Sequence, residues 1–113
     1  MSISTENRIT QINVDEFKQR LENNPKLCII DVRDEIEWNN GHMPTAIHIA
    51  KDHLVEKIAQ QVPDKSQAIY LHCQGGMRSN IAAGWLIDAG YTEVYNLQGG
   101  IHEWAAKGNA VVR

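Results

Sequence analysis

The residues best suited to chemistry lie in one short stretch, Cys73-Gln74-Gly75-Gly76-Met77-Arg78-Ser79. An apolar run, 68–71, precedes the cysteine, and a helical pattern of apolar residues follows Ser79. A strand, a loop and a helix N-terminus in this order bind anions, because unpaired amide N–H groups and the helix dipole converge at one point. A cysteine at that point favours its thiolate over its thiol. The pattern therefore predicts that Cys73 is a nucleophile.

The rest of this loop is predicted to bind substrate, through Gln74, Gly75, Gly76, Met77, Arg78 and Ser79. The two glycines are expected to take positive φ and let the backbone curl toward the sulfur. Arg78 offers a fixed charge and a fork of donors suited to a sulfonate, sulfate-like or phosphate group. Taken singly, a buried cysteine, a glycine turn and a solvated arginine are ordinary structural features. Taken together, they favour nucleophilic catalysis through a covalent intermediate.

Strand and helix patterns alternate along the chain. Strands are expected at 9–12, 27–32, 46–50, 68–72 and 94–97. Helices are expected after the caps Asn13 and Asp34, over 54–62 and 79–89, and around 101–105. This alternation predicts an α/β sandwich on a mainly parallel sheet. In such sheets ligands bind beyond the carboxyl ends of the strands, which is where Cys73 falls.

Length and composition narrow the class of protein. With 113 residues, the chain is expected to form a single domain over 8–113 after a frayed segment, 1–7. A net charge of −3 argues against a nucleic-acid surface, and no apolar run is long enough for a membrane span. The segment 1–7 lacks the apolar region of a secretory signal. Cys28 and Cys73 are too few for a disulfide framework, so we expect a reducing, cytoplasmic location.

Three motifs in order resemble those of one family. The segment Asp31-Val32-Arg33, followed by Glu37 and by Gly41-His42-Met43-Pro44-Thr45-Ala46, resembles the "DVR…GHIPGA" signature of the single-domain rhodaneses, which are thiosulfate sulfurtransferase-type proteins. The stretch 73–79 matches their active-site loop. The segment 97–101, with Trp104 and Gly108, matches their "LxGG…W…G" signature. Thr45 and Met43 replace the usual glycine and isoleucine, outside the loop.

This resemblance implies a fold and an activity. The fold is a three-layer sandwich with a central, mainly parallel five-stranded sheet and helices on both faces. Cys73 would take the outer sulfur of a small anionic donor such as thiosulfate, become a persulfide, and pass the sulfur to cyanide or another thiophilic acceptor. Arg78 would hold the departing sulfite or sulfonate end. No cofactor is implied, and the histidines and cysteines show no metal-ligand spacing.

Asp31 and Arg33 are further candidate residues, and two other functions have to be weighed against sulfur transfer. Asp31 and Arg33 flank the end of the second strand, where an internal ion pair supporting the loop, with Glu37 or another carboxylate as a further candidate partner, is favoured over substrate contact. A Cys-Arg phosphatase is disfavoured, because such enzymes place five residues between cysteine and arginine and only four, 74–77, stand here. A persulfide carrier or regulatory module that works with a partner protein remains an alternative, since a carrier would use the same residues.

Overall fold

The computed structural model describes residues 8–113, so the expected frayed segment 1–7 lies outside the described residues. The centre of the described part is a five-stranded sheet in the order β1-β5-β4-β2-β3. The strands are β1 (Ile9–Ile12), β2 (Cys28–Asp31), β3 (Ile47–His48), β4 (Ile69–His72) and β5 (Val94–Leu97). Every pair of neighbours runs parallel. The predicted α/β class and parallel sheet are confirmed.

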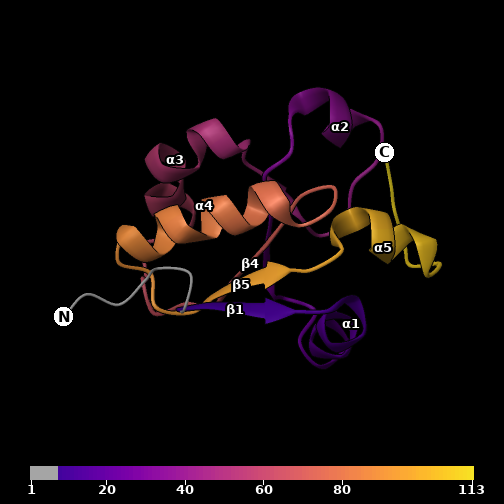
Figure 1. Ribbon diagram of the computed structural model, residues 1–113, viewed down its shortest axis with the longest axis horizontal. Coiled ribbons are helices and arrows are strands. Elements are labelled where there is room, and N and C mark those ends of the chain that lie inside the picture. The colour runs from indigo at the N-terminus through magenta and orange to yellow at the C-terminus, as the bar shows by residue number, and fades with distance from the viewer. Residues whose placement is uncertain (1–7) are drawn as a thin grey trace.

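Helices cover both faces of this sheet (Figure 1). They are α1 (Val14–Asn23), α2 (Glu35–Asn39), α3 (Leu54–Gln61), α4 (Met77–Asp88) and α5 (Gly100–Ala106), with a 3₁₀ turn, η2 (Lys51–His53), before α3. Apolar side chains of α3 and α4 form one buried cluster with the sheet, and those of α1 and α5 form the other. The sheet therefore separates two cores, as a three-layer sandwich requires.

The alternation of side chains along β4 decides where the cysteine points. Ile69 and Leu71 belong to the cluster on the α3–α4 side, and Tyr70 belongs to the cluster on the α1–α5 side. Cys73 continues the odd-numbered series and lies in the α3–α4 cluster. His72 has the opposite parity, so its side chain points away from that of Cys73.

The predicted start of the helix after the cysteine and the predicted length of the third strand are wrong. Helix α4 begins at Met77 rather than Ser79, because Gly76 adopts a left-handed conformation with φ of 106° and caps the helix. The loop after the cysteine therefore spans only 74–76. The third strand covers Ile47–His48 instead of 46–50, because the chain then turns into η2.

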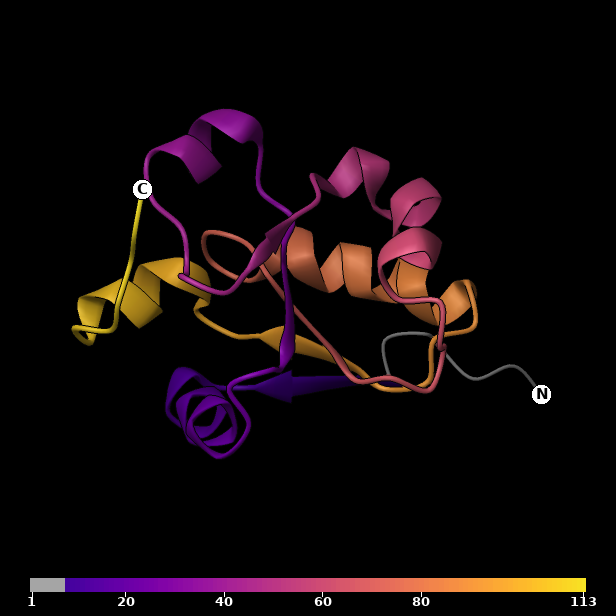
Figure 2. The same ribbon diagram turned by 180° about the vertical axis from the view of Figure 1, so that it is seen from behind.

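The end of the chain returns to the turn after α2. His42 and Val112 exchange two backbone hydrogen bonds, each of 2.8 Å, in an isolated antiparallel bridge. Figure 2 shows this last segment running from α5 up to the α2 side of the molecule. The indole N–H of Trp104, on α5, also donates to the Ala110 carbonyl at 2.9 Å. The segment 110–112 thus links α5 to the α2–β3 turn.

Among the helices of residues 8–113, none has both the length and the apolar character needed to cross a bilayer.

Candidate active site

Cys73 directly follows β4 and lies in a cradle of hydrogen-bond donors. Its Sγ accepts a hydrogen bond from the Gly76 N–H at 3.1 Å and lies 3.4 Å from the Ser79 hydroxyl oxygen. Burial raises the pKa of this thiol. The Ser79 hydroxyl and the N–H groups of Ser79, Gly76 and Gly75 outweigh it, so the pKa of Cys73 falls below its ordinary value. The sulfur thus lies within reach of several hydrogen-bond donors.

Helix α5 binds two carbonyls of the cysteine loop and thereby orients the loop peptides. The Ile101 N–H donates to the Cys73 carbonyl at 3.0 Å, and the His102 N–H donates to the Gln74 carbonyl at 3.1 Å. Because the C=O and N–H of one trans peptide point in opposite directions, these bonds leave the N–H groups of Gln74 and Gly75 directed away from α5. Figure 1 shows α5 next to this loop.

Gly100 makes this approach possible. It begins α5 with φ of +57°, and a Cβ there would overlap the backbone oxygens of both Cys73 and Gln74. Only glycine fits a backbone this close to another backbone in the left-handed region. The Gly99-Gly100 pair in the sequence therefore has a direct part in forming the loop.

The two loop glycines are not equivalent, which corrects the expectation of positive φ at both. Gly76 has φ of +106°, and a Cβ there would lie 3.3 Å from the Leu97 carbonyl oxygen. Gly75 is not among the glycines with positive φ, and a Cβ there would meet no atom within 4 Å. A single left-handed residue, Gly76, is enough to start α4 beneath the sulfur.

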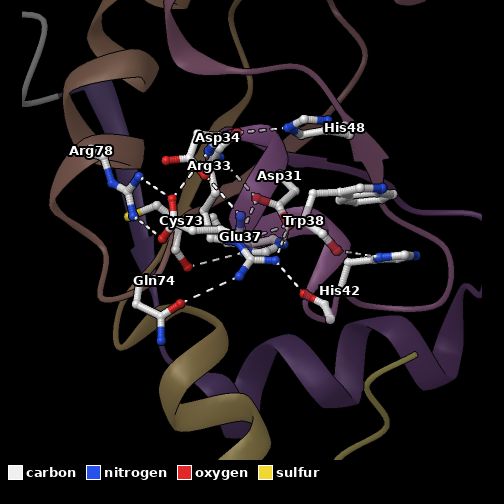
Figure 3. A network of polar contacts seen from close by, with 12 residues as sticks. Asp31, Arg33, Asp34, Glu37, Trp38, His42, His48, Cys73, Gln74 and Arg78 are labelled. Carbon is white, nitrogen blue, oxygen red and sulfur yellow. Dashed lines mark hydrogen bonds and ion pairs between the residues drawn. The ribbon is translucent and has the colours of Figure 1, made fainter. Parts of the chain in front are cut away.

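Arg78 is engaged by a partner from α2. Its guanidinium donates to both Glu37 carboxylate oxygens, at 2.7 and 2.8 Å (Figure 3). The hydrogen bond from Arg78 is the largest cause that lowers the pKa of Glu37, to about 2. The charge expected to hold a donor anion is thus largely balanced by a carboxylate.

Local interactions place Glu37 for this contact. Asp34 caps α2 by accepting a hydrogen bond from the Glu37 N–H at 2.9 Å, and the Glu37 carboxylate accepts one from the Asp34 N–H at 3.2 Å. Such a reciprocal pair is a capping box. The next residue, Trp38, stacks on His42 with ring centroids 3.6 Å apart and on His48 at 5.0 Å (Figure 3). These contacts fix α2 over the turn that leads into β3.

Asp31 and Arg33 form the internal ion pair that was expected, buried at 2.7 Å. Arg33 Nη2 also donates to the Gly41 carbonyl at 2.7 Å, and Nη1 lies 3.5 Å from the Gln74 side-chain oxygen. Asp31 has no exposed surface and Arg33 has 4%. The pair connects the end of β2 to the α2–β3 turn and to the loop, and it presents almost no surface to a substrate.

His72 supports the same region from the opposite face of β4. Its Nδ1 lies 3.2 Å from the Cys73 carbonyl oxygen, and its Nε2 lies 3.7 Å from Asp31 Oδ2. Burial lowers the pKa of this imidazole, despite the nearby carboxylate of Asp31. A neutral His72 fits a supporting role better than proton transfer at the sulfur, from which its side chain is turned away.

Comparison with known proteins agrees with this geometry. A family model described as "Rhodanese-like domain" matches residues 13–107. The chain belongs to the rhodanese-like domain family. The solution NMR structure of the rhodanese-like domain of the Alr3790 protein from Anabaena superposes with a TM-score of 0.82 at 33% identity, covering 90% of this chain and 77% of that one. The resemblance found in the sequence motifs is confirmed.

Two relatives of this rhodanese-like chain carry names connected with sulfur. A sulfurtransferase from Allochromatium vinosum is 31% identical over 104 residues, covering 92% of this chain and 95% of that protein. A Bacillus subtilis protein named as a candidate sulfur carrier, YrkF, is 34% identical over 99 residues and 88% of this chain. The match covers only 52% of the length of the Bacillus protein.

The rhodanese-like fold brings the loop residues together and adds one that the sequence reasoning missed. The sulfur of Cys73 is contacted by the Gly76 N–H and the Ser79 hydroxyl. The Met77 side chain, in contrast, is 82% exposed and turned to solvent. Asn96 on β5 is buried and bonds to Ser79. The only signal for it in the sequence is a polar residue within the otherwise apolar strand 94–97. Within residues 8–113, no group of three or more His, Cys, Asp or Glu side chains is placed to hold a metal.

Proposed function

We propose that this rhodanese-like chain is a sulfurtransferase that carries sulfane sulfur on Cys73. The Cys73 thiolate attacks the outer sulfur of a donor such as thiosulfate. The S–S bond of the donor breaks, and sulfite leaves with the bonding electron pair. The outer sulfur remains on Cys73 as a persulfide with a negative terminal atom. An acceptor, cyanide or a thiolate, then attacks that terminal sulfur, and the Cys73 thiolate leaves.

The observation that carries this proposal is the set of hydrogen-bond donors around the Cys73 sulfur. The Gly76 N–H and the other loop amides near the sulfur stabilise negative charge on it and on an atom bonded to it, and α5 holds the loop through the Cys73 and Gln74 carbonyls. The cradle is also small, since only residues 74–76 separate the cysteine from α4. A single terminal sulfur suits this space better than a phosphoryl group does, which argues against the phosphatase alternative.

Intact mass spectrometry after incubation with thiosulfate tests the proposal. We expect the protein to gain the mass of one sulfur atom, and Cys73→Ser to abolish the gain. Cys28→Ser is the matched control, because Cys28 is the other free cysteine and lies near the opposite end of the sheet on β2. It should still gain the sulfur. An unchanged mass, with Cys73 reduced and open to alkylation, would refute the use of thiosulfate.

A persulfide carrier is the second candidate, and the Arg78–Glu37 pair favours it. An anionic donor must compete with the Glu37 carboxylate for Arg78, whereas a persulfide on another protein brings no sulfonate that needs this charge. Incubation with a persulfidated cysteine-desulfurase-type donor, beside thiosulfate, distinguishes the two. Sulfur gain from the protein donor alone would support the carrier.

The setting we propose follows from the same chemistry. Cys28 and Cys73 are both free, and the reaction needs a reduced Cys73, so a reducing compartment such as the cytoplasm is proposed. Residues 8–113 are proposed to work as one domain. The proposed partners are a small anionic sulfur donor, a thiophilic acceptor and a sulfur-relay protein, without nucleic acid or membrane.

A further inference from the structure

Asn96 connects the cysteine loop to the neighbouring strand through hydrogen bonds that the reaction does not explain. Only 3% of its surface is exposed, and Ser79 is fully buried. Asn96 Oδ1 lies 2.6 Å from the Ser79 hydroxyl oxygen. Asn96 Nδ2 lies 3.2 Å from the Gly76 carbonyl oxygen and 2.8 Å from Oε1 of Gln11. Asn96 therefore touches two of the residues whose donors face the Cys73 sulfur, Gly76 and Ser79.

The Gly76 carbonyl fixes which way the Asn96 amide points. A backbone carbonyl only accepts hydrogen bonds, so the Asn96 NH₂ group must face it. The Asn96 oxygen must then face Ser79. An amide oxygen cannot donate, so the Ser79 hydroxyl is the donor in this 2.6 Å contact.

Ser79 has a single hydroxyl proton and two acceptors within reach. The Ser79 oxygen lies 3.4 Å from Cys73 Sγ, but a proton bonded to Asn96 is not available to the sulfur at the same time. In that position Ser79 turns lone pairs toward Cys73, which suits a protonated thiol that donates its S–H. A thiolate instead favours the hydroxyl turned toward the sulfur, with the Asn96 oxygen left without its donor.

We propose that Asn96 is a positioning residue that competes with the Cys73 sulfur for the hydroxyl proton of Ser79, and thereby sets how readily this sulfur carries negative charge. The hydroxyl turns to the sulfur when Sγ is a thiolate. It returns to Asn96 when Sγ is protonated or bears a neutral S–S bond in the persulfide. Asn96 therefore favours the thiol and the persulfide over the free thiolate.

The consequence for sulfur transfer rests on the proposed function of Cys73. When an acceptor attacks the terminal sulfur, the S–S bond breaks and the Cys73 thiolate leaves with the electron pair. A residue that withholds the Ser79 proton makes that thiolate a poorer leaving group and slows discharge. Removal of Asn96 should therefore speed the transfer of sulfur to cyanide.

Other charges act on the sulfur but do not change in the test. Arg78 on α4 interacts with Cys73 electrostatically and is paired with Glu37 on α2. Asp31 at the end of β2, its partner Arg33 in the segment that follows, and the buried His72 on β4 lie close to the loop. None of these groups bonds to Asn96, so substitutions at 96 leave their arrangement in place.

The test is the rate of alkylation of Cys73 by iodoacetamide as a function of pH, in Cys28→Ser protein. Without Asn96, the Ser79 hydroxyl can donate to the thiolate without giving up another acceptor. A hydrogen bond of this kind is worth about 0.5–1.5 kcal/mol net, so the thiolate fraction of Asn96→Ala should rise about two- to tenfold at pH values below the thiol pKa. The increase should vanish in the Ser79→Ala background. Gln11→Ala is the matched control, because the Gly76 carbonyl still orients Asn96, and its alkylation rate should equal that of the parent.

Slower alkylation of Cys73 in Asn96→Ala, instead of faster alkylation, would overturn the proposal. If Asn96 only supports the loop, Asn96→Ala loosens the Gly76 N–H and slows alkylation equally with Ser79 present and in the Ser79→Ala background. Should Asn96→Ala fail to fold, Asn96→Asp keeps the shape and holds the Ser79 proton more strongly. Its slowing should be larger with Ser79 present than in the Ser79→Ala background, and equal slowing would refute the competition.

Alkylation needs no sulfur donor, so this inference and the proposed function fail separately. A protein that gains no sulfur from any donor, but whose alkylation responds to Asn96→Ala as described, would refute the proposed function and support the positioning role. Faster discharge of the Asn96→Ala persulfide to cyanide would support both.

Discussion

At the scale of single residues, the charge on Arg78 is set by its partner. The guanidinium gives both of its forked donors to Glu37, so an incoming anion meets a pair whose charges largely cancel. Cys73 and Arg78 are neighbours along the chain and were found from their types and spacing. The carboxylate that balances Arg78 comes from α2, and only the folded position of α2 reveals it.

Glu37→Gln should therefore improve the use of thiosulfate. It leaves Arg78 without its balancing carboxylate, and a partly exposed ion pair is worth about 0.2–1 kcal/mol, so KM for thiosulfate should fall about 1.4- to fivefold. Steady-state kinetics at low ionic strength measure this change. Glu35→Gln, on the same helix but outside the pair, is the matched control for loss of one negative charge. An equal fall in KM for both variants would show a general charge effect instead.

At the scale of elements, the order of strands and helices along the chain was predictable, but the contacts between distant elements were not. Apolar periodicity placed Cys73 at the carboxyl end of a buried strand, and the structure adds that its side chain lies on the side of α3 and α4. The sequence contained no sign that α5 satisfies the carbonyls of Cys73 and Gln74, because that contact depends on the packing of distant segments. The early start of α4 was also missed, because it depends on the backbone conformation of Gly76.

Gly100→Ala tests the contact between α5 and the loop. The added Cβ would overlap the oxygens of Cys73 and Gln74, so α5 must move and release both carbonyls. We expect a loss of about 2–4 kcal/mol in unfolding free energy, from left-handed strain and two broken hydrogen bonds. Slower alkylation of Cys73 should accompany it.

Gly108→Ala separates strain from contact. Gly108 also has positive φ, at +82°, but a Cβ there would meet no atom within 4 Å. This variant should lose about 1–2 kcal/mol through strain alone and keep the alkylation rate of Cys73. If Gly100→Ala kept that rate as well, α5 would have no part in orienting the loop amides. Urea unfolding and iodoacetamide kinetics on both variants give the comparison.

At the scale of the whole molecule, the segment 110–112 joins α5 to the turn after α2, two parts of the fold that lie outside the sheet. It bonds to His42 in the α2–β3 turn and to Trp104 on α5, and α2 and α5 supply the residues on either side of the cysteine loop. The segment showed no strand or helix pattern, so the sequence did not predict this link. Its contribution is expected in the stability of the whole domain rather than in the chemistry of the sulfur.

Deletion of residues 110–113 should lower the urea midpoint while leaving the loop reactive. Three hydrogen bonds are lost, one of them from the buried Trp104, for about 2–4 kcal/mol of unfolding free energy. Arg33 keeps its bonds to Asp31 and the Gly41 carbonyl, so alkylation of Cys73 in folded protein should stay at the parental rate. Removal of Arg113 alone is the control and should preserve the midpoint. A parental midpoint after the longer deletion would show that the segment rests on the surface without stabilising it, whereas slowed alkylation would mean that α2 and α5 need this link to hold the loop in place.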